Sequence, residues 1–310
     1  AESSWRDSPT QTNELVLNQK VKVVMLQTRI SRLILLLIGA GLAVGGPVEA
    51  GELTSYCESN VGSPNDLKEL KHGLLQGYLA PETLPDSLKL LTPPPAPGSA
   101  AQALDEDIAR ANFALEATAR WTQASKDADL NFPAAASIFS CSLGIEISEE
   151  RTPRLYTLLR RSLTDAGLAS YKAKNHYQRS RPFMGNGQAI CTPDDESELR
   201  TDGSYPSGHT SVGWAWALIL SEIAPNQQDQ ILQRGLEYGR SRNICNVHWH
   251  SDVQAGQLIG AATVSRLHTN EVFRADLRAA AEEIQAQISL GNIRNSDDCK
   301  REKAALDNNP

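Results

Sequence analysis

Strict alternation of apolar and polar residues, the pattern of β-strands, is almost absent from this sequence of 310 residues, and no internal repeat is present. Apolar residues instead recur at steps of three and four, as they do along one face of an α-helix. These absences argue against a sheet-based fold and against a repeat array. We therefore expect an all-α protein whose loops carry the polar chemistry.

An excess of basic residues is also missing. Lys and Arg together number 30 against 37 Asp and Glu, which gives a net charge of −7. Because a protein that reads duplex nucleic acid normally presents a basic face, we do not expect nucleic acid as a partner. An anionic substrate would have to be attracted by a local basic pocket rather than by the whole surface.

The cysteines contain no Cys-x-x-Cys pair, which argues against zinc-binding and thioredoxin-like chemistry. Their number is odd, so at most two intrachain disulfides can form, and the sequence does not indicate which cysteines pair. We interpret Cys245 as a buried or disulfide-bonded structural residue. All five follow residue 50, in a segment that we expect to be exported: Cys57, Cys141, Cys191, Cys245 and Cys299.

Residues 25–50 have the order of a secretory signal peptide: Arg29 and Arg32, an apolar run over 33–44, and a small-x-small cleavage signal that ends at Ala50. The apolar run is short for a transmembrane helix, so a membrane anchor is the less favoured alternative. Residues 1–24 lack an initiator Met and apolar periodicity, and we expect them to be a disordered upstream extension or added sequence. The mature protein, from Gly51, is then periplasmic or secreted.

No segment after residue 50 is apolar enough to span a bilayer, so we expect no membrane association of the mature form. Residues 51–310 are long enough to bury a core as one domain. The proline-rich stretch 91–98 predicts an extended surface segment, and the polar tail from about 292 is expected to be loosely held unless Cys299 anchors it. Helices are expected over 100–125, 133–143, 152–166, 168–179, 210–224, 227–240, 252–267 and 271–288.

Three polar clusters carry the candidate chemistry. Pro206-Ser207-Gly208-His209 directly precedes an apolar helix, where Ser207 can cap the first turn while the other amides stay unpaired. Such a helix N-terminus favours an anion, and glycine at 208 lets the backbone approach a phosphate closely. This turn alone is a weak signal, because a Ser-Gly turn before a helix is more often a simple cap.

The second cluster is cationic. Lys174 and Arg181 lie upstream of the turn and Arg242 lies downstream. An arginine offers a planar fork that suits phosphate oxygens, and a lysine offers a point charge. The third cluster is His248 with Asp252, which would share a face if the segment is helical. A carboxylate at one imidazole nitrogen fixes the tautomer and leaves the other as a nucleophile or base.

Taken together, Lys-x6-Arg-Pro, Pro-Ser-Gly-His and Ser-Arg-x5-His-x3-Asp resemble the signature of the phosphatidic acid phosphatase type 2 and vanadium haloperoxidase superfamily. The longer strings at 84–99, 203–210, 213–218 and 241–253 look like the bacterial class A non-specific acid phosphatases. The resemblance covers nearly all of the chain after residue 50. It implies an all-α, single-domain helical bundle of the acid phosphatase and vanadium-dependent haloperoxidase type.

Carried over residue by residue, the resemblance implies that His248 attacks phosphorus, that Asp252 orients it, and that His209 protonates the leaving alkoxide. The phosphate oxygens would be held by Lys174, Arg181, Ser207, Gly208 and Arg242. Three protein cations can supply the charge stabilisation that phosphoryl transfer needs, so we expect no metal and no cofactor. His209 would have to be charged and His248 neutral, which predicts a weakly acidic optimum.

The resemblance further implies hydrolysis of a broad range of phosphate monoesters, including nucleotides and aryl and sugar phosphates, with transfer to other alcohols plausible. Inorganic phosphate or vanadate would inhibit, and an oligomer is possible. Alternatives are a vanadium haloperoxidase on the same scaffold, a membrane lipid phosphatase, and a phosphate-binding protein without catalysis. The string His248-Trp249-His250-Ser251-Asp252 also spells the HxHxD of metallo-hydrolases, although on a helix residues two apart point away from each other.

Overall fold

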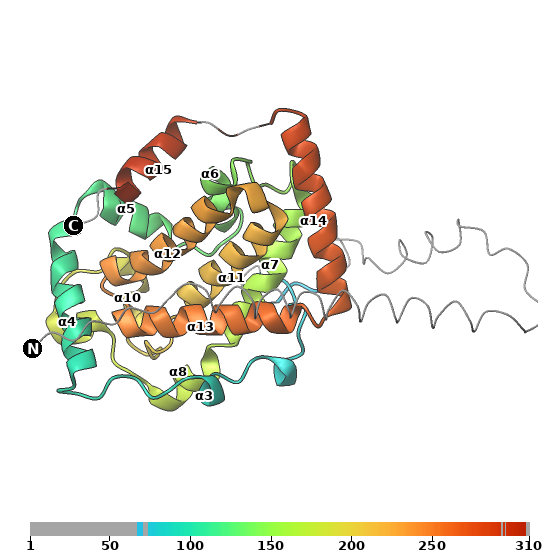
Figure 1. Cartoon of the computed structure of the whole chain (residues 1–310). Helices are drawn as coiled ribbons and strands as arrows, with labels where there is room; N and C mark the ends of the chain where they lie inside the picture. Colours follow the sequence, from blue (N-terminus) through green and yellow to red (C-terminus); the bar gives the residue numbers. More distant parts are fainter. Residues whose placement is uncertain (1–66, 71–73, 293, 295, 308–310) are drawn as a thin grey trace, which may run out of the picture. The chain divides into compact units, whose positions relative to one another are not determined.

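The structure is a computed structural model that describes residues 67–70, 74–292, 294 and 296–307 (Figure 1). Over these ranges the chain forms helices and no strand, apart from one isolated antiparallel bridge between Glu69 and Leu75. The predicted all-α class is therefore confirmed. The expected upstream extension (1–24) and signal peptide (25–50) lie outside the described residues, as does Cys57.

The segment expected as one helix over 100–125 is two helices, α4 (Ala100–Asn112) and α5 (Ala119–Lys126). A 3-10 turn follows α4, and Ala117 adopts a left-handed φ of 60° that no helix can accommodate. Thr118 then begins α5 by accepting a hydrogen bond from the Trp121 amide. The break separates α5, which packs against α12 (Gln228–Ile244) and α15 (Asp297–Asp307), from α4.

The helix expected over 133–143 is also shorter than predicted. It consists of a 3-10 segment, Ala134–Phe139, and a single α-helical turn, α6 (Ser140–Leu143). Gly144 ends α6 at a φ of 75°, a conformation that glycine adopts without steric cost. The segment is nevertheless buried, since Ile138, Phe139 and Leu143 belong to the main hydrophobic core.

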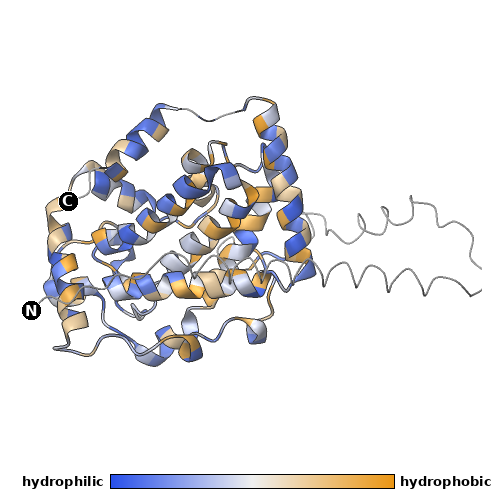
Figure 2. Ribbon diagram, in the orientation of Figure 1, coloured by the Kyte–Doolittle hydropathy of each residue, from blue (hydrophilic) through white to orange (hydrophobic). Residues whose placement is uncertain are grey.

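The core is built around α11 (Gly208–Ile223), which packs against α7 (Pro153–Leu168), α12 (Gln228–Ile244) and α13 (His250–Leu267). Figure 1 shows α11 among these helices, and α14 (Glu271–Ser289) lies against α7. A helix enclosed on several sides can be apolar around most of its circumference, and α11 is: Figure 2 shows it mainly in the hydrophobic colours. Most of its residues are buried.

The contact between α11 and α13 is unusually close at two glycines. A Cβ added at Gly256 would lie 2.5 Å from the Ser207 carbonyl oxygen, and one at Gly260 would lie 2.5 Å from the Ser211 carbonyl oxygen. Only glycine therefore permits this separation of the two backbones. The consequence is functional as well as structural, because the close contact brings the N-terminus of α11 beside the N-terminus of α13.

Short helices lie on the side of the bundle near those two N-termini: α3 (Ser87–Leu90), α8 (Tyr171–Tyr177), α9 (Pro182–Asn186) and α10 (Glu196–Leu199). The expected helix over 168–179 is thus shorter, beginning only at Tyr171. The proline-rich stretch has no helix or strand, as predicted, and is tied down where the Tyr205 hydroxyl donates to the Thr92 carbonyl at 2.8 Å.

The C-terminal tail is anchored. Residues Asp297–Asp307 form α15, in which Cys299 is disulfide-bonded to Cys141 and Glu302 pairs with Arg234 at 3.1 Å. The tail was expected to be loosely held unless Cys299 anchored it. Cys299 does anchor it, through its disulfide bond. The second disulfide joins Cys191 to Cys245, in accord with the structural interpretation of Cys245. Within the described ranges, no helix combines the length and the apolarity needed to cross a membrane.

Candidate active site

Ser207 caps α11 as the sequence predicts. Its Oγ accepts a hydrogen bond from the Thr210 amide at 3.2 Å and another from the Thr210 hydroxyl at 2.9 Å. Its own amide donates to the Asp252 carbonyl at 2.9 Å, which fastens the start of α11 to the first turn of α13. Gly208 follows, and a Cβ there would lie 3.7 Å from Cε of Lys174. The first turn of α11 and the lysine therefore border the same space.

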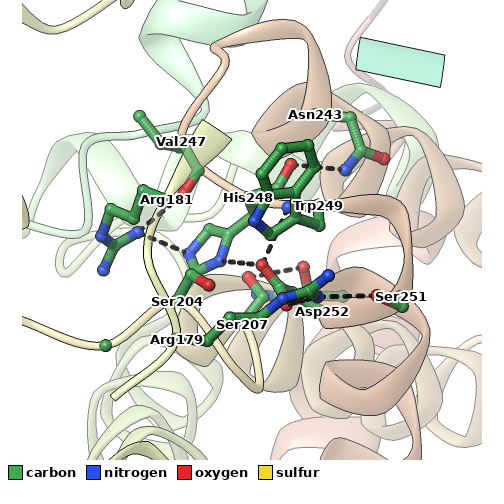
Figure 3. A network of polar contacts seen from close by, with 12 residues as sticks. Arg179, Arg181, Ser204, Ser207, Asn243, Val247, His248, Trp249, Ser251 and Asp252 are labelled. Atoms are coloured by element: carbon green, nitrogen blue, oxygen red, sulfur yellow. Dashed lines mark hydrogen bonds and ion pairs between the residues drawn. The ribbon is translucent and has the colours of Figure 1, made fainter. Parts of the chain in front are cut away.

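His248 and Asp252 come together, but not on a helix face. The helix α13 begins only at His250, after His248, with Trp249 as its N-cap residue. The condition under which the two residues would share a helix face is therefore not met. Asp252 faces back across the cap, accepting from the Trp249 amide at 2.8 Å, and its Oδ2 lies 3.5 Å from Nδ1 of His248 (Figure 3). That separation is longer than a well-formed hydrogen bond, and Nδ1 has no other hydrogen-bond partner among the described residues.

Burial and nearby cations determine the protonation state of His248. The side chain is 3% exposed, and burial lowers its pKa well below the usual value, with further lowering by Arg181 and other nearby cations. Nε2 lies 3.2 Å from Nη1 of Arg181. Because a guanidinium can only donate, Nε2 must be the acceptor and Nδ1 must carry the proton toward Asp252. This is the neutral tautomer that a nucleophile at Nε2 requires.

Two of the predicted cations share a partner that the sequence analysis missed. Lys174 Nζ donates to Asp202 Oδ2 at 2.7 Å and to the Gly203 carbonyl at 2.6 Å. Arg181 donates to the same Asp202 oxygen at 2.9 Å. The side chain of Asp202 is 31% exposed, whereas those of Lys174 and Arg181 are 4% and 1% exposed. Its place beside the Gly203 to Thr210 string was the only sequence signal that pointed to it.

Arg242 differs from the other two cations. It is 2% exposed, forms no ion pair among the residues that the structure describes, and its Nε has no hydrogen-bond partner. Burial lowers its pKa to about 10. An uncompensated buried charge is costly, so its retention here indicates an anion site. The charge of Arg242 contributes to lowering the pKa of both His209 and His248.

His209 lies in the first turn of α11, with Nε2 2.9 Å from the Ala128 carbonyl oxygen. A carbonyl only accepts, so Nε2 carries a proton, and Nδ1 is the nitrogen left to gain or give one. Burial, and then the charge of Arg242, lower the pKa of His209 well below its usual value. The expectation that His209 is charged therefore does not hold for the protein without a bound anion, because the cations that suit a phosphate repel a proton.

A second missed residue is Arg179, inside the spacer of the Lys-x6-Arg motif. Its guanidinium donates to Asp252 Oδ1 at 2.6 Å and to Asp105 Oδ2 at 2.8 Å. Asp105 lies in α4, far upstream of the motifs, where no spacing rule could connect it to them. All eight predicted site residues are thus brought around one space, together with the unpredicted Asp202, Arg179 and Asp105.

The same part of the chain offers little for a metal. No group of three or more His, Cys, Asp and Glu side chains in the described ranges could hold a metal ion. His250, the second histidine of the HxHxD string, is the first residue of α13, and His248 precedes the helix. The string therefore does not form the ligand set that its letters suggest.

Comparisons with known proteins bear on the family of the chain. Residues 155–273 match the family model described as the PAP2 superfamily. The chain is 45% identical to the non-specific acid phosphatase of Providencia stuartii over 207 residues, which cover 66% of this chain and 84% of that protein. It is 39% identical to the non-specific acid phosphatase of Salmonella typhimurium (70% and 87% covered) and 38% identical to the acid phosphatase of Zymomonas mobilis (71% and 83% covered).

Proposed function

The chain belongs to the PAP2 superfamily and, within it, to the bacterial class A acid phosphatases, and from this premise we propose that it hydrolyses phosphate monoesters through a phosphohistidine formed at His248. The observation that carries the proposal is the buried guanidinium of Arg242, which forms no ion pair in the described part of the chain and whose charge lowers the pKa of both His209 and His248. A bound phosphate would compensate this charge, and both imidazoles would then lie next to it.

The phosphate would be held by three cations and a helix N-terminus. Arg242 has its Nε free, and Lys174 retains one of its three donors after its two protein contacts. The Gly208 amide and the Ser207 hydroxyl add donors at the start of α11, where the helix dipole also favours an anion. These groups would stabilise the charge on the equatorial oxygens in the transition state, which is the main requirement of phosphoryl transfer.

In the first step, Nε2 of His248 attacks phosphorus, the bond from phosphorus to the ester oxygen breaks, and His209 gives a proton from Nδ1 to the departing oxygen. In the second step, a water molecule attacks the phosphohistidine, His209 takes a proton from that water, and phosphate and neutral His248 are released. Phosphate oxygens must first draw Arg181 away from Nε2, to which it lies within 3.2 Å in the free protein. Binding of substrate thereby frees the nucleophile.

A bound phosphate would also allow His209 to become protonated. In the free protein the charge of Arg242 lowers the pKa of His209. A phosphate dianion between them offsets that charge and raises the pKa of His209, because an opposite charge nearby favours the protonated form. We expect the acid to be charged only when substrate is bound, with activity greatest in weakly acidic solution.

The proposal extends to substrate range and location. Since the groups named above contact only phosphate, we expect nucleotides and aryl and sugar phosphates to be accepted, and alcohols to compete with water for the phosphohistidine. Inorganic phosphate and vanadate should inhibit as occupants of the same site. The signal-peptide pattern of residues 25–50 supports a periplasmic or secreted location.

The decisive experiment uses p-nitrophenyl phosphate with the purified protein, with and without a chelator, beside His248→Ala and His209→Ala. We expect full activity in chelator, a loss of at least about a thousandfold in His248→Ala, and an acid-labile, base-stable phosphoprotein after rapid quenching of the wild type. An active His248→Ala variant would refute the nucleophile. Loss of activity in chelator with recovery on adding zinc would favour a metallo-hydrolase instead.

A further inference from the structure

Arg179 connects two buried carboxylates that belong to different helices. Its side chain is 9% exposed, those of Asp105 and Asp252 are 2% and 0% exposed, and it contacts both at hydrogen-bond distance. Nη1 contacts Asp252 and the Ser251 hydroxyl, while Nη2 contacts Asp105 and Gln102. A rigid planar fork is suited to bridging two fixed acceptors in this way.

The position of this guanidinium is itself well defined. Asp105 also accepts from the Ser251 amide at 2.8 Å and from its hydroxyl at 2.6 Å, so α4 is bound to the first turn of α13. On another side, the indole of Trp249 lies 5.4 Å from the guanidinium carbon, within the range of a cation–π contact. Arg179 is thus held from several sides, and Figure 3 shows it next to Asp252. A guanidinium fixed in this way leaves the Asp252 carboxylate little freedom to rotate.

We propose that Arg179 is a positioning residue that keeps Asp252 ionised and oriented, and through it keeps the proton of His248 on Nδ1. The inference rests on the proposed function, in which Nε2 of His248 is the nucleophile. No motif of the sequence analysis assigned a role to Arg179.

The electrostatic part of the argument follows from burial. A carboxylate removed from water tends to take up a proton, and burial accordingly raises the pKa of Asp252, with Arg179 as the largest opposing charge. Lys174 and Arg181 act on Asp252 from farther away, without a hydrogen bond to it in the described part of the chain. The other titratable groups near Asp252 are the Tyr205 hydroxyl and His248. Asp105 also forms an ion pair with Arg179.

The geometric part concerns the two oxygens of Asp252. Arg179 fixes Oδ1 and the Trp249 amide fixes Oδ2, so the carboxylate plane is determined and Oδ2 faces Nδ1 of His248. Without Arg179, a protonated Asp252 would no longer favour a proton on Nδ1 of the imidazole. Once a phosphate has drawn Arg181 away from Nε2, the proton could then occupy Nε2, and the attacking lone pair would be lost.

The test compares Arg179→Gln with Arg179→Lys, and uses Arg161→Gln as the matched control. Arg161 is a similarly buried arginine in α7, 12% exposed, paired with Asp276 rather than with a site residue. For each protein, kcat/KM of p-nitrophenyl phosphate is measured across acidic and neutral pH. Arg179→Gln should move the acid limb of the profile upward by about one pH unit or more. Near neutrality the Arg179→Gln variant should lose a smaller fraction of kcat/KM than it loses at acidic pH.

Arg179→Lys keeps the charge but loses the fork. Its acid limb should stay near that of the wild type while kcat falls at every pH, and Arg161→Gln should keep the wild-type profile. Arg179→Gln leaves Asp105 buried without its cation. The double variant Asp105→Asn/Arg179→Gln removes that second charge, while Asp252 still lacks its arginine partner, and it therefore provides a second test. Near-ultraviolet circular dichroism establishes that each variant is folded.

An acid limb that does not move in a folded Arg179→Gln variant, with the same fractional loss at each pH, would overturn the inference and leave Arg179 a packing residue. That outcome is distinct from failure of the proposed function, which would appear in the wild type as phosphatase activity that survives His248→Ala. A shifted limb in Arg179→Gln together with an unshifted one in Arg161→Gln supports the positioning role.

Discussion

Nη1 of Arg181 lies 3.2 Å from Nε2 of His248, so a permanent donor covers the lone pair that would attack phosphorus. The contact has two effects. It holds the imidazole in the neutral tautomer with its proton on Nδ1, and it occupies the nucleophile until a stronger acceptor takes the guanidinium. A phosphate oxygen is such an acceptor, because charge-assisted hydrogen bonds to phosphate are strong. In the proposed mechanism, the free site would therefore be prepared for attack but would react only after an anion has entered.

The first prediction concerns stability against pH. The pKa of His248 is lowered well below its usual value in the folded protein, mainly by burial. Between that lowered value and about 6.5, the unfolded chain binds a proton that the folded chain does not, so stability falls as pH falls. His248→Asn removes this group. In phosphate-free buffer its free energy of unfolding should depend on pH less steeply than the wild type, by up to about 1.4 kcal/mol per pH unit.

Urea unfolding at several values between about pH 5 and 7.5 measures this dependence. Above about pH 6.5 neither state of His248 gains a proton, so the curves of wild type and variant should run parallel. His176→Asn, which replaces an exposed histidine of α8, is the control and should follow the wild type throughout. Parallel curves for His248→Asn over the whole range would contradict a buried, neutral His248.

The second prediction follows from the missing partner of Arg242. Replacing this buried cation with methionine should raise the free energy of unfolding by about 1 to 3 kcal/mol, while activity falls by about a hundredfold or more because a phosphate donor is lost. The measurements are urea unfolding in phosphate-free buffer and turnover of p-nitrophenyl phosphate.

Arg234→Met is the matched control for that change. Arg234 is as deeply buried but pairs with Asp127 and Glu302, so its loss leaves two carboxylates without their cation. It should destabilise the protein by about 3 to 5 kcal/mol. If Arg242→Met were destabilising to a similar extent, Arg242 would have a structural partner and the argument for an anion site would fail.

The helices and the motif residues could be predicted from sequence because both depend on local spacing. Apolar residues three and four apart predicted α7, α11, α12, α13 and α14 closely, and Ser207 was recognised as a cap from its place before an apolar run. The break at Ala117 was missed, because a left-handed alanine contradicts local propensity.

What the sequence could not provide are the pairings between distant segments. Asp105 contacts Arg179 and Ser251 across long stretches of chain, and nothing in its own helix marks it as part of the site. Asp202 lies next to a motif, yet its double contact with Lys174 and Arg181 arises only when α8 and the loop before α11 fold together. The lowered pKa of His209 was missed for the same reason, because it depends on burial and on Arg242.

The third prediction concerns Asp202, which takes one donor from each of Lys174 and Arg181 through a single oxygen. Asp202→Asn removes a negative charge next to the phosphate site and leaves the two cations less compensated. Inorganic phosphate should then inhibit at concentrations several-fold lower, since an added unit of attraction at short range is worth about 1 kcal/mol or more even near the surface. Competitive inhibition of p-nitrophenyl phosphate hydrolysis measures the change.

Glu196→Gln, at a half-exposed carboxylate that pairs with Arg200, serves as the control and should leave inhibition by phosphate unchanged. Weaker inhibition in Asp202→Asn would show that the carboxylate acts chiefly to hold Lys174 and Arg181 in place, and that its charge does not compete with phosphate.

The fourth prediction links helix packing to catalysis. A Cβ at Gly256 would lie 2.5 Å from the Ser207 carbonyl oxygen, a backbone atom that cannot move without displacing the start of α11. Gly256→Ala should therefore cost about 1 to 3 kcal/mol of stability by overpacking. It should also lower kcat, because the Ser207 amide is hydrogen-bonded to the Asp252 carbonyl.

Gly185→Ala separates this effect from a general cost of changing a helical glycine. Gly185 lies in α9, and a Cβ there would meet nothing within 4 Å, so the variant should keep both the stability and the kcat of the wild type. Urea unfolding and turnover at saturating p-nitrophenyl phosphate are measured for both variants. If Gly256→Ala lost stability but kept the full kcat, the spacing of α11 and α13 would matter for folding alone. A parallel loss of both would show that the two helix N-termini must be held at this separation for His248 and the phosphate to align.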